Sequence, residues 1–274
     1  MSARIYLITE GVHDVAFLGK LLQATLGFAQ IVSKEDLDSA WEPLLPTWPY
    51  KGSLRGSVPV PSFYRRSSGD TIAIVNAQGI SEINKRLRVH RQVLDQAGVS
   101  LDAVGIVLDA DSNELPAARF TKLGTALASQ GLSCPATAET VAGTPRTGIF
   151  VLPGGGTPGT LEDLLLECAA LVYPTLSGAA ASFVDGLDRT ASDLTPEDLV
   201  ESGKPAGRNK AAIAAMGAVL KPGKPIQASL QDHRWIEPRT IVLSRISALS
   251  RFLGDLAGVP ATIDAPRAEP REAL

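Results

Sequence analysis

The sequence is poor in the residues that build disulfide frameworks and zinc sites. Its 274 residues include two cysteines and three histidines. Cys134 and Cys168 are too few for a disulfide framework or a cysteine zinc cluster, and the histidines show no metal-ligand spacing. The sequence therefore predicts reduced thiols and excludes a zinc site of the usual cysteine–histidine kind.

Long apolar runs are missing as well. No run approaches the roughly 18 residues that a membrane span requires. The first residues, MSARIYLITEG, lack the apolar segment and the cleavage site of a signal peptide. We therefore expect a cytoplasmic protein with no membrane partner.

The sequence has no large excess of charge of either sign. Its formal net charge is −3, which excludes a globally basic coat for nucleic acid. The charges are nevertheless uneven, because segments 51–91 and 203–224 are basic whereas segment 185–201 is acidic. A locally basic surface is therefore compatible with the slightly negative net charge of the whole chain.

Short apolar runs alternate with helical patterns along the first part of the chain. Runs at 4–9, 71–76, 103–108 and 147–152 each precede a segment with apolar residues at helical spacing. This alternation is typical of stacked strand–helix units. The sequence predicts an α/β fold in which helices flank a mostly parallel sheet, followed by a helical C-terminal portion.

The same patterns divide the chain. We place the α/β domain at residues 1–172 and a helical extension, packed on that domain, at residues 173–258. Residues 33–70 break the strand–helix pattern with prolines and aromatic residues, so we interpret them as an insertion, partly of short strands, packed by its own aromatics. The tail 259–274 is rich in proline, alanine and charge, and we expect it to be disordered.

Acidic residues follow three of the predicted strands. Glu10 follows the first strand, Asp109 and Asp111 follow the third, and Glu162 comes shortly after the fourth. Because the carboxyl ends of parallel strands lie at one edge of a sheet, we expect these carboxylates to gather there. A divalent cation would cancel their repulsion, and oxygen ligands favour Mg²⁺, Mn²⁺ or Ca²⁺ over zinc.

Each of these features also has a plain structural interpretation. Glu10 precedes a helix, where carboxylates commonly act as caps or dipole partners. Residues 111–113 can cap the next helix. The glycine-rich segment 154–159 fits G-x-G-x-x-G, but no strand ending in an acid follows about 20 residues later, which favours a flexible turn over a dinucleotide site.

Two motifs in order resemble those of the Toprim domain, the catalytic fold shared by topoisomerases and primases. Glu10-Gly11-Val12-His13-Asp14 is similar to the opening Toprim motif, and Asp109-Ala110-Asp111-Ser112 is similar to its Asp-x-Asp motif. Gly79 matches the glycine turn between them. Gly159-Thr160-Leu161-Glu162-Asp163 and a helix with Lys210 resemble further elements of the overcoming-lysogenization-defect (OLD) nucleases. The resemblance covers about residues 4–255, apart from the insertion.

The resemblance implies a Toprim-like sheet and hydrolysis of phosphodiester bonds in nucleic acid, with one or two Mg²⁺ or Mn²⁺ ions. Glu10 would ligate metal or act as a general acid/base. Lys210 would neutralise charge on the phosphate, although an exposed lysine on a solvated helix is an equal interpretation. The implied metal ligands are Glu10, Asp14, Asp109, Asp111 and Glu162.

The expected partner is nucleic acid, either DNA or RNA. Aromatic residues interleave with arginines in the insertion, a mixture that suits phosphate contact and base stacking, although a solvated loop with structural aromatics is the alternative. The arginines are Arg55, Arg65 and Arg66, and the aromatics are Tyr50, Phe63 and Tyr64. OLD nucleases usually carry an ATPase domain, and no Walker motif occurs here, so an ATPase would be a separate chain or would be missing.

Two other functions stay open at this point. One is a non-catalytic module for nucleic-acid binding or assembly, with a vestigial Toprim site. The other is a primase-like transfer of nucleotides, which would require nucleoside triphosphates.

Overall fold

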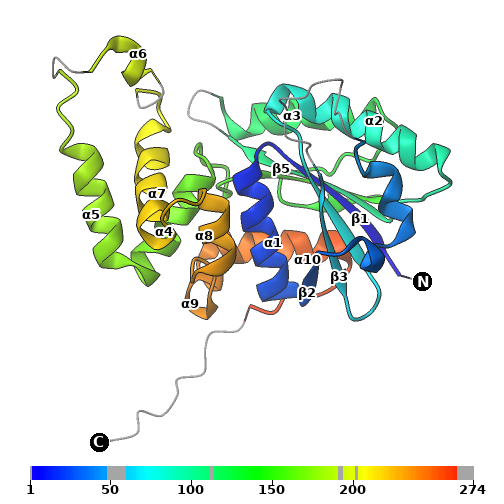
Figure 1. Ribbon diagram of the computed structural model, residues 1–274. Coiled ribbons are helices and arrows are strands. Elements are labelled where there is room, and N and C mark those ends of the chain that lie inside the picture. Colours follow the sequence, from blue (N-terminus) through cyan, green and yellow to red (C-terminus); the bar gives the residue numbers. More distant parts are fainter. Residues whose placement is uncertain (1, 48–59, 111–113, 191–193, 201–202, 264–274) are drawn as a thin grey trace, which may run out of the picture.

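A seven-stranded sheet forms the centre of the computed structural model, which describes residues 2–47, 60–110, 114–190, 194–200 and 203–263 (Figure 1). The strand order is β2-β3-β4-β1-β5-β7-β6. Strands β4, β1, β5 and β7 are parallel, β3 pairs antiparallel with both β4 and β2 at one edge, and β6 pairs antiparallel with β7 at the other. The strands are β1 (Arg4–Thr9), β2 (Phe28–Ile31), β3 (Ser62–Arg66), β4 (Thr71–Asn76), β5 (Ala103–Asp109), β6 (Val141–Ala142) and β7 (Arg146–Leu152).

Helices cover both faces of this sheet. Helices α2 and α3 lie on one face, and α1 and α10 lie on the other (Figure 1). From α4 onward the described chain is helical, which confirms the predicted α/β fold with a helical C-terminal portion. The helices are α1 (Val12–Leu26), α2 (Ile83–Gln96), α3 (Pro116–Ala128), α4 (Leu161–Val172), α5 (Pro174–Asp185), α6 (Pro196–Leu199), α7 (Gly207–Leu220), α8 (Ile226–Asp232), α9 (Pro238–Ile241) and α10 (Ser244–Ala257).

The central strands are apolar on both sides, because both faces of the sheet are covered. In β1, Ile5 and Leu7 pack into the core beneath α1 and α10, whereas Tyr6 and Ile8 pack into the core beneath α2. Successive side chains of a strand point to opposite faces, so one short run supplies two cores. None of the described helices is both long enough and apolar enough to cross a membrane.

The last helix is part of this layered structure. A Cβ atom at Gly105 of β5 would lie 2.4 Å from Leu256 Cδ2, and one at Gly148 of β7 would lie 2.6 Å from Phe252 Cε2. Glycine in these strands therefore allows α10 to approach the sheet closely. Helices α9 and α10 are separate, because the backbone leaves helical geometry at Leu243, where ψ is 135°.

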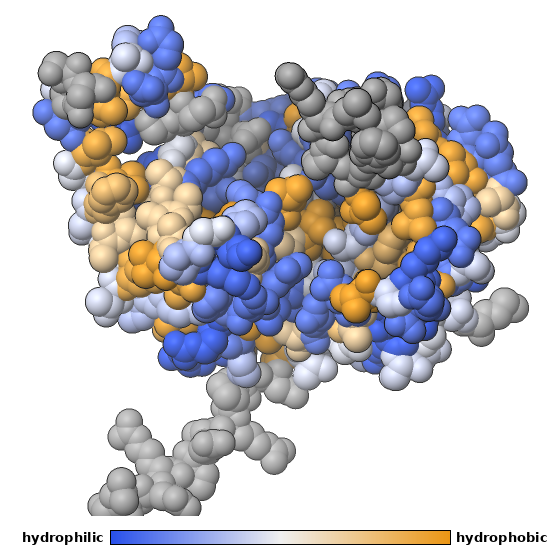
Figure 2. Space-filling model, in the orientation of Figure 1, coloured by the Kyte–Doolittle hydropathy of each residue, from blue (hydrophilic) through white to orange (hydrophobic). Residues whose placement is uncertain are grey.

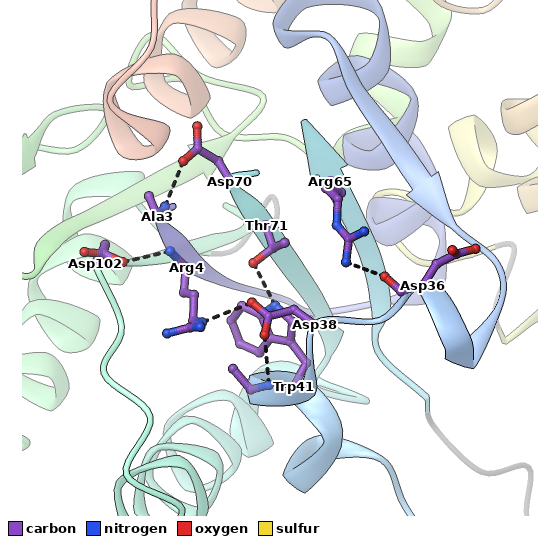
Figure 3. A network of polar contacts seen from close by, with 10 residues as sticks. Ala3, Arg4, Asp36, Asp38, Trp41, Arg65, Asp70, Thr71 and Asp102 are labelled. Atoms are coloured by element: carbon purple, nitrogen blue, oxygen red, sulfur yellow. Dashed lines mark hydrogen bonds and ion pairs between the residues drawn. The ribbon is translucent and has the colours of Figure 1, made fainter. Parts of the chain in front are cut away.

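Residues 33–70 are only partly packed by their own aromatics: Trp41 and Phe63 lie with ring centroids 6.3 Å apart, but the segment also joins the main sheet. Part of the segment forms β3, which extends the main sheet, and β2 just before the segment was not predicted. Trp41 is fully buried and donates from Nε1 to Thr71 Oγ1 over 3.0 Å, so this aromatic packs on the sheet (Figure 3). Asp38, three residues earlier, pairs with Arg4 Nε at 3.1 Å (Figure 3). Backbone pairing at the sheet edge therefore incorporates the described part of the insertion into the domain.

The beginning of the predicted disordered tail is ordered. Val259, Ala261 and Ile263 pack against the core, and the backbone N–H of Thr262 donates to Thr25 O over 2.8 Å. Residues 264–274 lie outside the described residues.

On the face drawn in Figure 2, hydrophilic and hydrophobic residues are interspersed.

Candidate functional site

Strands β1 and β5 are neighbours at the centre of the sheet, and the chain leaves them on opposite faces. After β1 it forms α1 on one face and later reaches β4, whereas after β5 it forms α3 on the other face and later reaches β7. In open parallel sheets, such a divergence creates a crevice at the carboxyl ends of the strands, where ligands commonly bind. Glu10 follows β1 and Asp109 ends β5, so both residues lie at this point.

Asp14 enters the site from the first turn of α1. Its side chain is buried, and Oδ2 accepts hydrogen bonds from the Thr9 hydroxyl and the Gly11 N–H, both at 2.8 Å. These contacts cap the helix, because Gly11 has no side chain to do so. Burial raises the pKa of Asp14 and the charge of Glu162 adds to this rise, whereas the two hydrogen bonds oppose it.

Asp109 connects β5 to α4. Its Oδ1 accepts a hydrogen bond of 2.8 Å from the backbone N–H of Leu161, the first residue of α4. Burial raises the pKa of Asp109 well above its usual range, and the negative charges of Asp14, Glu162 and Glu10 raise it further. The structure therefore brings these four predicted acids within electrostatic reach of one another.

Glu162 lies in the first turn of α4 and is 5% exposed. Its Oε1 lies 3.9 Å from His13 Nδ1, and its buried Oε2 has no hydrogen-bond partner among the described residues. Burial raises the pKa of Glu162, but interactions with His13 and Thr160 and the positive charge of Lys210 outweigh it, so the pKa is lowered. Glu162 is thus held ionised, whereas Asp109 resists ionisation.

Helix α7 adds two residues beside these acids. Lys210 is exposed, and its charge acts on Glu162. Asn209 Nδ2 donates to Asp163 Oδ1 over 2.9 Å. The sequence pointed to Lys210, but it gave no indication of the contact between Asn209 and Asp163, which are 46 residues apart. His13 has no metal-ligand spacing in the sequence, yet the structure places it next to Glu162.

A family model described as "Protein of unknown function (DUF3226)" matches residues 4–253. The chain belongs to this family. Among solved structures, the hypothetical protein PH0156 from Pyrococcus horikoshii OT3 is similar at 17% sequence identity, with a TM-score of 0.47. That match covers 93% of this chain and 95% of the other chain. No curated protein matches the sequence.

The acids of this DUF3226 chain have oxygen ligands that suit a hard cation, but the described acids do not form a complete coordination site. All are carboxylates, which suit Mg²⁺ or Mn²⁺, and the orphaned Glu162 Oε2 is a buried atom that requires a partner. Within the described ranges, however, no group of three or more His, Cys, Asp and Glu side chains is arranged to hold a metal ion. One oxygen of Asp14 and one of Asp109 are already engaged by backbone N–H groups. Asp111 lies outside the described residues.

Two of the predicted nucleic-acid contacts, Arg65 and Arg66, do not lie at this site. Arg65 and Arg66 end β3 opposite the start of β4, whereas the acids lie at the carboxyl ends of the parallel strands. Arg65 donates to the carbonyl of Asp36, as Figure 3 shows, and Arg55 is outside the described residues. Phe63 and Tyr64 are 6% and 1% exposed, so their rings fill the core: the burial contradicts base stacking by these two residues and agrees with the alternative of structural aromatics, whereas Tyr50 lies outside the described residues.

Proposed function

We propose that this DUF3226 protein is a nuclease of Toprim-like type, which hydrolyses phosphodiester bonds in DNA or RNA with bound Mg²⁺ or Mn²⁺. The observation that carries the proposal is the gathering of two buried carboxylates, Asp14 and Glu162, and two half-buried ones, Glu10 and Asp109, at one point of the sheet. The Toprim resemblance of the motifs around Glu10 and Asp109 supports the same interpretation.

Burying several like charges together lowers the stability of a fold unless a positive charge balances them. The rise in the pKa of Asp109 expresses this cost directly, because the charges of Asp14, Glu162 and Glu10 contribute to it. Lys210 is exposed and acts on Glu162 from the outer side, so it balances part of the charge. A divalent cation between Asp109 and Glu162 would balance the remainder.

In this proposal each residue of the site has a separate role. Glu10, Asp109 and Glu162 would hold the ion, together with Asp111 as the sequence predicts, and Asp14 would fix the start of α1 beside them. The ion, when bound, supplies activation of water and stabilisation of the leaving oxygen. Lys210 would balance negative charge on the phosphate, and Glu10 would accept the proton of the attacking water. Water would add to phosphorus and its proton would pass to Glu10, the phosphorus–oxygen ester bond would break, and the leaving oxygen would take up a proton from solvent.

One observation favours a second candidate, a non-catalytic nucleic-acid-binding module. The described acids do not form a preformed group of three ligands, and backbone contacts hold two of them. Such a module would bind nucleic acid in a strongly salt-dependent way and would not cleave it.

Incubation of the full chain with supercoiled plasmid and with labelled RNA, in Mg²⁺ and in Mn²⁺, separates the two candidates. The nuclease proposal predicts cleavage that Asp109→Asn abolishes and EDTA stops. Asp95→Asn is the matched control, because it removes the same charge from an exposed position on α2. Salt-dependent binding without cleavage would establish the second candidate, and the absence of both binding and cleavage would contradict the two together.

A further inference from the structure

Three consecutive residues in the first turn of α7 interact with two neighbouring helices, α5 and α4. Arg208 binds the carboxylate of Asp185 on α5, with Nε at 2.7 Å and Nη2 at 2.6 Å. Asn209 binds Asp163 on α4. Lys210 is exposed, and its charge reaches Glu162. The first turn of α7 is therefore fixed on one side by α5 and on another by α4.

Asp163 is shared between two helix starts. Its Oδ2 accepts the Thr160 N–H over 2.7 Å and closes the cap of α4, the helix that carries Glu162. Its Oδ1 accepts from Asn209 on α7, the helix that carries Lys210. One carboxylate thus fixes the relative position of the glutamate and the lysine of the proposed site.

The remainder of α7 does not fix its first turn in the same way. Gly207 is buried but has no side chain to pack, the buried side chains Ala212, Ile213 and Met216 begin a turn later, and Lys210 itself has a long, flexible side chain. Adjacent residues of a helix are rotated by about 100° from one another, so anchoring Asn209 determines the direction in which Lys210 leaves the helix.

We infer that Asn209 is a positioning residue, whose hydrogen bond with Asp163 holds Lys210 beside Glu162 to receive a phosphodiester group of nucleic acid. This inference rests on the proposed function for its substrate class. The pair has a defined polarity, because the amide of Asn209 donates and the carboxylate of Asp163 accepts.

That polarity provides the test. Asn209→Asp places two carboxylates against each other and breaks the bond. Adding Asp163→Asn restores it in reverse, because an asparagine at 163 can accept the Thr160 N–H with Oδ1 and donate to an aspartate at 209 with Nδ2. The matched control is Asn84→Asp, which adds the same charge on α2, on the opposite face of the sheet.

The measurements are kcat and KM for Mn²⁺-dependent cleavage of a fluorescein-labelled single-stranded DNA, with the melting temperature of each variant. We expect Asn209→Asp to reduce kcat/KM about tenfold or more, because a misplacement of about 1 Å near a reacting group can cost about a hundredfold. Lys210→Ala should show the same kind of loss, and the double variant should recover most of the activity. A loss of activity in Asn209→Asp at an unchanged melting temperature, reversed in the double variant, supports positioning, since mere destabilisation would lower the melting temperature of Asn209→Asp.

Asp163→Asn alone separates positioning from simple charge. It removes a negative charge, so a purely electrostatic effect would strengthen DNA binding and cleavage, whereas the loss of the second acceptor oxygen should weaken them. Full activity of Asn209→Asp, or failure of the double variant to recover, would overturn the inference.

Failure of the proposed function would look different. If the unmodified chain does not cleave DNA, the same variants are compared by the salt dependence of binding to the same DNA in Ca²⁺. The slope of log K against log salt is negative, and Lys210→Ala and Asn209→Asp should each reduce its magnitude by about 0.7. The double variant should restore the original slope. An unchanged slope in Asn209→Asp would overturn the inference whether or not the protein is a nuclease.

Discussion

Replacing Asp109 by asparagine should stabilise the metal-free protein. Asparagine has nearly the same shape as aspartate, and its Oδ1 can still accept the hydrogen bond from the Leu161 N–H. The substitution removes only the charge, which burial and the neighbouring acids make unfavourable. A residue that the fold retains at a cost to its own stability is typical of a functional site.

The size of the effect follows from two opposing contributions. An environment that raises the pKa of an aspartate costs about 1.4 kcal/mol of folding free energy for each pH unit above its ordinary pKa. The cost stops growing once the pH exceeds the raised pKa. At neutral pH it is therefore at most about 4 kcal/mol. Exchanging a charged acceptor for a neutral one on Leu161 loses about 1 kcal/mol. We expect a net gain of about 1–3 kcal/mol, which corresponds to a rise in melting temperature of about 3–9 °C.

The stability difference between Asp109→Asn and the unmodified chain should depend on pH in a defined direction. Because the folded-state pKa of Asp109 is raised, its contribution to stability is complete below the ordinary pKa of aspartate and is lost as the pH rises through the raised pKa. The difference in melting temperature between Asp109→Asn and the unmodified chain, measured in EDTA, should therefore be small below about pH 4 and grow toward neutral pH. A variant that is less stable than the unmodified chain at neutral pH would refute this reasoning and make the carboxylate a structural acceptor.

Three further substitutions test other parts of the description. Asp14→Ala should lower the free energy of unfolding by about 1–2 kcal/mol in a denaturant titration, because Oδ2 caps α1, and an unchanged stability would contradict that role. Gly105→Ala should cost about 1–3 kcal/mol in the same assay, since its Cβ would meet Leu256 and displace α10; a neutral effect would mean that α10 packs less closely on β5. Arg65→Ala should leave the salt dependence of DNA binding unchanged, because this side chain lies at the opposite edge of the sheet from the acids, and a reduced slope would place the DNA path there.

The four parallel strands could be predicted because each is a short apolar run followed by a helical pattern. The edge strands could not. β6 has two residues, and β2 has only one buried residue among four, so their pairing depends on tertiary register rather than on local pattern. The burial of Phe63 and Tyr64 follows from the same pairing, since β3 places them on opposite faces of a covered sheet.

The gathering of Glu10, Asp109 and Glu162 could be expected from the sequence, because the carboxyl ends of parallel strands share one edge. The capping role of Asp14 was less visible. Its spacing from Gly11 is that of a capping pair, but glycine supplies no side chain for the usual motif. The contact of Asn209 with Asp163 depends on how α7 docks on α4, and no local pattern encodes it.

The central claim is that a divalent cation binds among Glu10, Asp109 and Glu162, and a crystal grown with Mn²⁺ tests it most directly. We predict an anomalous diffraction peak in contact with the carboxylates of Asp109 and Glu162, and its loss in crystals of Asp109→Asn. The contradicting result is a structure at saturating Mn²⁺ that has no peak there. In such a structure the carboxylate of Asp109 would only accept the Leu161 N–H, which asparagine in Asp109→Asn can also do.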